Sequence, residues 1–321
     1  MRSSNIGGQA VMEGIMMRHK DKYSIAVRRP DQEIELKVED YKCIFGNHAF
    51  LKKPIIRGVV SFVDSLVVGT KCLMYSAEIA GDEEDEETVR KNEQLTEEER
   101  SAKKAKEDKQ FKWLLYITVA ISMVVSVAAF MFLPYVLASL IREVGASEFL
   151  VTIVEAFVKL ALFIGYMFLI SRMKDIQRTF MYHGAEHKCI NCVEHGLPLT
   201  VENVLKSSRL HKRCGTSFLF FVLAISIILL MLIQVESPLM RVIVRIALIP
   251  VIAGISYEVL KLAGRSENPI INLLSRPGLA IQKLTTKEPD DSMIEVAIQA
   301  VEAVFDWRAY EAENFKTAEN L

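Results

Sequence analysis

Four long apolar stretches dominate the pattern of hydrophobic and polar positions along the chain. They cover residues 113–138, 149–171, 216–235 and 239–262. Each stretch is long enough to cross a bilayer as a helix, which takes about 20 residues. The pattern predicts a mainly α fold, a polytopic membrane helix bundle with four spans at 113–262.

Residues 54–80 form another apolar stretch, but charges interrupt it at regular intervals. Arg57, Asp64, Lys71 and Glu78 recur every seven positions, which places them on one slowly drifting stripe of a helix. A simple span rarely carries charges at such spacing. We expect an amphipathic helix that lies in the membrane interface or packs into a groove of the bundle, with a fifth span as the alternative.

The N-terminal residues 1–53 have the character of a small cytoplasmic β segment. Two runs rich in β-formers, Tyr23–Val27 and Glu33–Val38, flank a turn sequence and predict a hairpin. A third short strand is expected near Cys43–Phe45.

Two polar regions complete the chain. Residues 81–112 carry dense runs of acidic and then basic side chains, so they cannot build a core and are expected to be a charged flexible linker. Residues 263–321 are expected to form a cytoplasmic tail with an amphipathic helix at about 292–314.

Composition narrows the class of protein. Of the 321 residues, 51% are hydrophobic and 25% charged, and the formal net charge is -1. A net charge this close to zero gives no indication of a nucleic-acid partner. Five cysteines, an odd number without a visible export signal, argue against a disulfide framework.

Lysine and arginine are distributed unevenly among the connections between the apolar stretches. They are frequent before the first stretch, between the second and third, and after the fourth, but scarce at 139–148 and 236–238. Cytoplasmic loops carry the excess of basic residues. We therefore expect a multi-pass protein of the cell membrane, with both termini and the loop 172–215 in the cytoplasm.

Ionisable residues also occur inside the apolar stretches. Glu155 and Lys159 lie one turn apart in the second stretch, and Arg245 lies at a similar depth in the fourth. Such residues are costly in a bilayer and usually face a partner. We expect Glu155 to pair with Arg245, most simply to fix the register of the helices.

The loop 172–215 contains the highest density of side chains that can bind metal or act in catalysis. His183-x-x-Glu186-His187 places two imidazoles on one face of a helix, where they can bind one metal ion, and Glu186 can accept a proton from a metal-bound water as the catalytic base. Such a zinc site needs a third protein ligand and an open position. Glu258 is one candidate for that ligand, and His211 and Cys214 are the local alternatives.

A second interpretation uses the cysteines. Cys189-x-x-Cys192 followed by His211-x-x-Cys214 has the spacing of a closed, structural zinc ribbon. A hydrogen-bonded polar cluster without metal is a third interpretation. In any of these, the side chains that could orient the imidazoles are Asp175, Arg178 and Glu194.

The motifs resemble those of a known family. Gly7-Gly8-Gln9-Ala10-Val11-Met12-Glu13-Gly14, Tyr182-His183-Gly184-Ala185-Glu186-His187-Lys188, Arg213-Cys214-Gly215-Thr216 and Glu288-Pro289-Asp290-Asp291 are similar to motifs of the YqhQ-like bacterial membrane proteins. That family is described as of unknown function or as a predicted metal-dependent enzyme.

The resemblance also implies which site residues follow the family pattern: His183, Glu186, His187, Cys192, Glu194, His211 and Cys214. Cys189 stands where the family commonly has Thr. This departure weighs against the ribbon and in favour of a site built on the two histidines of the helix.

Two functions follow from these patterns. The first is a metal-dependent hydrolase, with zinc as cofactor, that acts on a peptide or lipid-derived substrate at the cytoplasmic face. The second is a non-enzymatic factor for membrane-protein biogenesis, transport regulation or signalling, in which the His/Cys cluster is structural. Membrane lipid is the expected partner in both. A protein partner at the cytoplasmic face and a homo-oligomer are left open.

Overall fold

The chain is described by a computed structural model that divides into two compact units. One comprises Met1–Gly81 and Tyr166–Leu321, and the other comprises Asp82–Gly165. The structure describes residues 2–46, 48–81, 106, 110, 113–114, 116–122, 124–126, 128–233, 235, 238–266 and 268–315. The charged linker predicted at 81–112 lies almost entirely outside the described residues.

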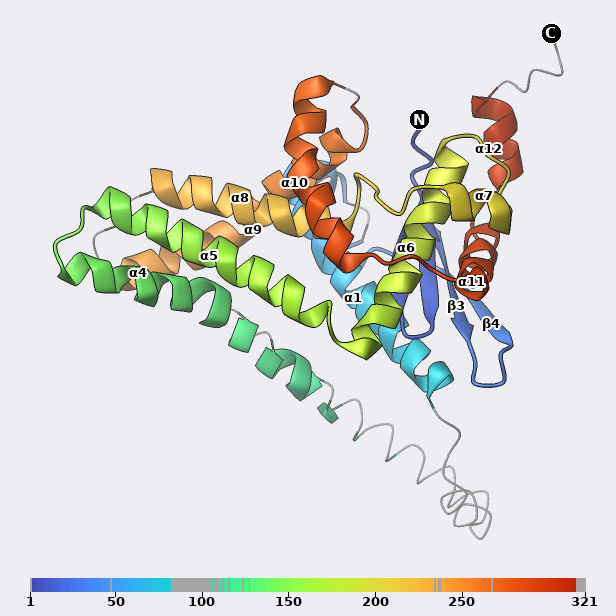
Figure 1. The fold of residues 1–321 in the computed structure, drawn as a ribbon, viewed down its shortest axis with the longest axis horizontal. Coiled ribbons are helices and arrows are strands. Elements are labelled where there is room, and N and C mark those ends of the chain that lie inside the picture. The colour runs from blue at the N-terminus through green and yellow to red at the C-terminus, as the bar shows by residue number, and fades with distance from the viewer. Residues whose placement is uncertain are drawn as a thin grey trace. The chain divides into compact units, whose positions relative to one another are not determined.

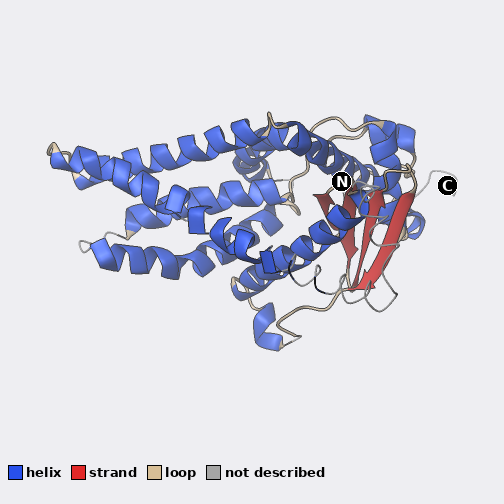
Figure 2. Cartoon of the chain, turned by 90° about the horizontal axis from the view of Figure 1, so that it is seen from below, coloured by secondary structure: helices blue, strands red, loops and turns tan. Residues whose placement is uncertain are grey.

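A four-stranded antiparallel sheet begins the first unit (Figures 1 and 2). Its strands follow one another in space as they do in the chain: β1 (Gly7–Val11), β2 (Gly14–His19), β3 (Lys22–Arg28) and β4 (Ile34–Asp40). The predicted hairpin corresponds to β3 and β4.

The sequence was less informative about the other strands. The third strand expected near Cys43–Phe45 is wrong, because the Gly46 amide donates to the Cys43 carbonyl and closes a turn there. Strands β1 and β2 were not expected, since glycine has a low strand propensity. Their pairing with each other and with β3 determines their conformation instead.

The helices of the first unit are, in chain order, α1 (Ile56–Ala80), α6 (Lys174–Glu194), α7 (Val201–Lys206), α8 (Gly215–Leu232), α9 (Pro238–Ala263), α10 (Pro269–Thr285), α11 (Asp291–Glu302) and α12 (Trp307–Asn314), with a short 3-10 turn, η1 (Ala49–Lys52), before α1. Helix α10 packs against α8, as Figure 1 shows in orange and gold. The predicted loop 172–215 is thus largely helical, because it contains α6 and α7.

Helices cover both faces of the sheet. Ile15 and Met17 belong to the main core, which α6 and α11 share. Met16 and Ile25 face the other way and pack with Cys72 of α1. Successive side chains of a strand point to opposite faces, so the apolar run of β2 is buried on both sides.

The predicted charged stripe of α1 finds its partners on neighbouring elements. Arg57 forms a bidentate ion pair with Glu258 of α9, with Nε 2.6 Å from Oε1. Asp64 accepts hydrogen bonds from Tyr41 and from the amide of Ile44. Further along α1, Lys71 pairs with Glu39 of β4, so the second half of this helix lies against the sheet.

Within the described residues, five helices rather than the expected four are long and apolar enough to cross a membrane. They are Ile56–Ala80, Tyr116–Glu143, Glu148–Ile170, Gly215–Leu232 and Val242–Ala263. The last four coincide with the predicted apolar stretches. The additional one is α1, whose charges had argued against a span.

The C-terminal tail forms two helices after α10, whereas one was expected. In place of one helix at about 292–314, the structure has α11 and α12 with a break between them. Asp306 accepts a hydrogen bond from the Ala309 amide and so caps the second helix. Apolar residues of α11, including Ile294 and Val301, are completely buried in the main core.

The second unit contains η2 (Ala128–Phe132), α4 (Leu133–Glu143) and most of α5 (Glu148–Ile170). Arg142 at the end of α4 pairs with Glu148 at the start of α5, with Nε 2.6 Å from Oε1. Glu155 and Lys159 lie on α5, one turn apart, whereas Arg245 lies on α9 of the other unit. Their predicted pairing stays a prediction.

Candidate metal centre

Three side chains with metal-binding atoms converge at the start of α8. His183 and His187 lie one turn apart on α6, and Cys214 is the residue that precedes α8. One ligand atom from each lies within 4.8 Å of the others, and Cys214 Sγ is 3.2 Å from His183 Nε2. Around a tetrahedral zinc ion such atoms would be about 3.3–3.6 Å apart. The His183–Cys214 pair is close to this separation, and two imidazoles with one thiolate are a donor set that suits zinc.

The orientation of the imidazoles supports the same fit. His183 Nδ1 lies 2.8 Å from the Thr285 carbonyl oxygen, and His187 Nδ1 lies 2.7 Å from that of Arg209. A carbonyl can only accept, so each Nδ1 donates its hydrogen to a carbonyl and each Nε2 is the ring nitrogen left to face the cluster. Metal-binding histidines usually have this arrangement, in which the second ring nitrogen donates to a carbonyl.

A glycine allows the segment after α10 to approach α6. A Cβ atom at Gly184 would lie 2.0 Å from the Lys287 carbonyl oxygen. The Lys287 amide donates to the Phe180 carbonyl of α6, which fixes the segment next to the helix. Thr285, the hydrogen-bond acceptor for His183, is held in place by this contact.

Buried polar side chains of α6 hold the segment that leads to Cys214. Lys188 Nζ donates to the carbonyls of Leu205 and Ser207, at 2.7 and 2.9 Å. Asn191 Nδ2 donates to the carbonyls of Ser208 and Leu210. These hydrogen bonds fix the backbone of residues 205–210 against α6.

Gln282 of α10 completes this support by binding both backbone groups of His211. Its Oε1 accepts from the His211 amide at 3.0 Å, and its Nε2 donates to the His211 carbonyl at 2.7 Å. Gln282, Lys188 and Asn191 had no predicted role. The available signal for Lys188 was its place in the motif Tyr182–Lys188 that resembles the family.

Glu186 lies beside the cluster. Its side chain is buried, and one carboxylate oxygen is 4.0 Å from His183 Nε2. Burial raises the pKa of this carboxyl group, while the two histidines and a hydrogen bond from the Gly8 backbone oppose the rise. A Cβ atom at Gly8 would lie only 2.9 Å from Glu186 Cγ, so glycine is required for β1 to approach this closely.

The neighbouring imidazoles favour the thiolate form of Cys214. Burial alone would raise the pKa of the thiol, but His183 and His187 lower that pKa well below its ordinary value. Thr216 also donates its amide hydrogen to Sγ, at 3.4 Å. The thiolate is the form of cysteine that binds metal.

His211 belongs to a separate buried network. Its Nε2 is 3.3 Å from Glu194 Oε2, and Glu194 also accepts from the amide and hydroxyl of Ser4, at 2.8 and 2.9 Å. Arg213 forms an ion pair with the same carboxylate. Although burial tends to raise the pKa of Glu194, His211 and Arg213 keep it below its usual value.

The other predicted site residues lie apart from the cluster. Glu258 is engaged by Arg57, and Arg178 by Glu13 of the β1–β2 turn. Asp175 lies in the first turn of α6. In the described part of the chain, the one His/Cys/Asp/Glu group arranged for a metal ion does not include Cys189 or Cys192, which lie in the main core.

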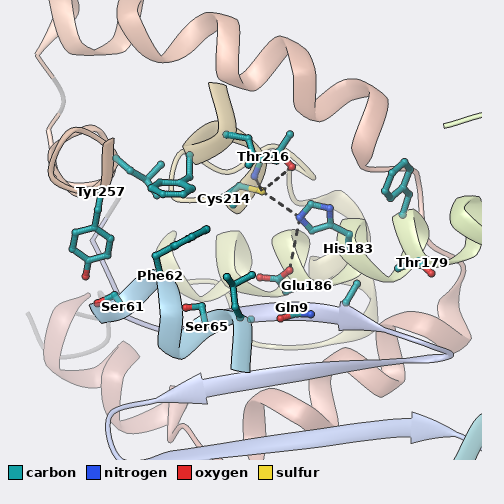
Figure 3. Close-up of a pocket in the computed structure, with 18 residues that line it drawn as sticks. Gln9, Ser61, Phe62, Ser65, Thr179, His183, Glu186, Cys214, Thr216 and Tyr257 are labelled. Carbon is teal, nitrogen blue, oxygen red and sulfur yellow. Dashed lines mark hydrogen bonds and ion pairs between the residues drawn. The ribbon is translucent and has the colours of Figure 1, made fainter. Parts of the chain in front are cut away.

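The cluster opens into a pocket of about 570 Å³ (Figure 3). His183, Glu186 and Cys214 line one end of it. The remainder is formed by apolar and hydroxyl side chains of α1, α6, α8 and α9 and by the backbone of β1. The pocket gives the cluster an open side, which a catalytic metal needs and a structural one does not.

The chain is similar to proteins without an assigned function. The sequence profile described as "Protein of unknown function (DUF1385)" matches residues 53–307. A protein of Bacillus subtilis (strain 168) described as "Uncharacterized protein YqhQ" is 38% identical over 317 residues, which cover 98% of this chain and 96% of the relative. No solved structure matches the chain.

Proposed function

For this chain, which belongs to the YqhQ-like family of unknown function (DUF1385) as its motifs predicted, we propose the function of a membrane-bound, metal-dependent hydrolase. His183, His187 and Cys214 hold the metal, and Glu186 is the general base. When bound, zinc in such a site lowers the pKa of a coordinated water to about 7 and polarises a substrate carbonyl.

One observation carries this proposal. His183 Nε2 lies 3.2 Å from Cys214 Sγ and a ligand atom of His187 lies within 4.8 Å of both, while both Nδ1 atoms face backbone carbonyls. A merely polar cluster would not require both rings to turn the same way. The carboxylate of Glu186 lies on the pocket side of the cluster, where it can take a proton from a water next to a bound substrate.

We place the site at the cytoplasmic face of the cell membrane. Cys214 directly precedes the apolar helix α8, and Tyr257 and Leu260, near the end of α9, line the same pocket. The basic connections lie at these ends of the two helices, which supports a cytoplasmic position. Substrates embedded in or attached to the membrane, peptide or lipid-derived, are within reach of such a site.

Metal analysis of the purified protein tests the proposal. We expect about one zinc per chain in the unmodified protein and in Glu186→Gln, but much less in His183→Ala, since that variant lacks a ligand. His195→Ala and Glu258→Ala are the matched controls and should retain metal. Glu186→Gln should lose hydrolytic activity by about 10²–10⁴-fold. Equal metal content in His183→Ala and the unmodified protein would refute the site.

The second candidate is a non-enzymatic membrane factor with a structural cluster. Its support is the burial of the ligands, since His187 and Cys214 are 2% and 4% exposed. In that case Glu186→Gln would change neither metal content nor any activity, and His183→Ala would lower the amount of folded protein. A protein partner at the cytoplasmic surface would then copurify with the unmodified chain.

A further inference from the structure

We propose that the pocket binds its substrate as an extended peptide that pairs with the outer edge of β1. This inference rests on the proposed function and specifies its substrate class. The peptide would run along β1 and bring a backbone carbonyl to the end of the pocket formed by His183, Glu186 and Cys214.

Strand β1 is at the edge of the sheet, and that edge borders the pocket. β1 pairs with β2 on one side, and Gly8, Gln9 and Ala10 line the pocket. Figure 3 shows Gln9 on this strand next to Glu186. The pocket is therefore located where a further strand would join the sheet.

Helices on the two faces of the sheet form the walls of this opening. Ala10 packs toward the core that contains α6, while Gln9 points the other way, toward Gly69 of α1. An extended chain could lie between α1 and α6 in the plane of the sheet.

The backbone of β1 has the orientation that pairing requires. Val11 faces Gly14 across a two-residue turn and forms a hydrogen-bonded pair with it. The Gly8–Met17 pair is therefore not hydrogen-bonded, and the Gly8 backbone groups point away from β2. In an antiparallel strand, alternate residues direct both backbone groups to the same side. Ala10 therefore directs its amide and carbonyl toward the pocket, where an added strand can bind to them.

The sequence of β1 lacks the usual protection of an edge strand. Proteins commonly block open edges with charged residues or proline, whereas β1 reads Gly-Gly-Gln-Ala-Val. An edge strand without charged residues or proline, next to the pocket that contains the His183–His187–Cys214 cluster, has the properties of a peptide-binding surface.

The lining of the pocket favours a neutral, apolar chain over a phosphate ester. Phe62, Leu66, Phe180, Phe218 and Leu260 contribute most of the large side chains. None of the described residues that line it is Lys or Arg, so a phosphate group would have no basic partner beyond the cluster itself. An acyl chain could use the same apolar surface, but it could not use the strand edge.

Binding of an N-methylated peptide series tests the inference. Zinc-loaded Glu186→Gln protein in detergent is titrated with a fluorescein-labelled peptide of Leu, Ala and Phe flanked by lysines, and binding is followed by fluorescence anisotropy. Each backbone amide of the peptide is methylated in turn. We expect methylation of every second amide to weaken binding by about tenfold, because each of these methyl groups removes one hydrogen bond to β1. Methylation of the amides between them should leave the affinity unchanged.

Two variants of β1 provide the control on the protein side. Ala10→Pro removes the amide that faces the pocket at a position where proline does not interrupt the ladder, and it should weaken peptide binding about tenfold with metal content unchanged. Ala10→Gly retains that amide and should bind like the parent. The methylation series uses intact β1, so it remains decisive if Ala10→Pro fails to fold.

The possible results separate this inference from the proposed function. Absence of peptide binding, or equal tolerance of methylation at every amide, overturns the inference. If the protein hydrolyses a long-chain fatty-acid ester in that case, the proposed hydrolase function still holds, with a lipid as the substrate. If peptide binding is sensitive to methylation at every second amide but the protein binds no zinc, the strand pairing is supported and the proposed hydrolase function is refuted.

Discussion

At the scale of single residues, the centre depends on contacts that only small side chains permit. Gly184 lies between two residues of the histidine motif and directly against the Lys287 carbonyl. Gly8 lies against Glu186 in the same way. The sequence indicated the proposed ligands through their spacing, but it could not indicate these close approaches, because they join segments that are far apart in the chain.

Gly184→Ala should therefore disrupt the centre without removing a ligand. The added methyl group would overlap the Lys287 carbonyl, which lies 2.0 Å from its expected position. Overpacking of this kind costs about 1–3 kcal/mol, and Thr285 would move away from His183. We expect a lower unfolding temperature and less bound zinc.

Gly215→Ala is the matched substitution, since nothing lies within 4 Å of its added Cβ. This variant should unfold at or slightly above the temperature of the parent, because alanine is the better helix former. Equal unfolding temperatures for Gly184→Ala and Gly215→Ala would show that the contact with Lys287 is not close.

The third ligand illustrates what spacing can and cannot determine. From the sequence, Glu258 was a candidate for that position, and His211 and Cys214 were the local alternatives. In the structure Cys214 joins the histidines, while Glu194 and Arg57 engage the other two. Ion pairs with other residues therefore keep His211 and Glu258 away from the cluster. Such pairs depend on tertiary contacts, which the spacing of residues in the sequence does not reveal.

At the scale of elements, hydropathy located the apolar helices well but did not describe the role of α1. This helix is long and apolar enough to cross a membrane, yet its charges are bound by the sheet and by α9. Arg57 near its start pairs with Glu258, and Lys71 in its second half pairs with Glu39. We propose that α1 remains on the cytoplasmic side and links the sheet to α9.

Labelling of introduced cysteines tests the position of α1. In a Cys43→Ser background, Glu78→Cys at the exposed end of α1 should react with a membrane-impermeant maleimide only after cells are permeabilised. Val144→Cys, in the connection between α4 and α5, is 82% exposed and should react in intact cells. Reaction of Glu78→Cys in intact cells would make α1 a fifth span.

At the scale of the whole molecule, the candidate centre lies in the unit formed by Met1–Gly81 and Tyr166–Leu321. Segments from the N-terminus, the centre and the C-terminus meet at one site: Gly8 from β1, the histidines from α6 and Thr285 from α10. This explains why the motifs that resemble the family are spread along the sequence. Each motif contributes residues that line the same centre or hold it in place.

X-ray absorption at the zinc edge of the detergent-purified protein tests the central claim most directly. We predict two nitrogen ligands at about 2.0–2.1 Å, one sulfur ligand at about 2.3 Å and one light atom from solvent. Cys214→Ser should remove the sulfur contribution, whereas Cys189→Ser and Cys192→Ser should retain it. A shell with two or more sulfurs, or a protein that binds no zinc, would contradict the proposed centre.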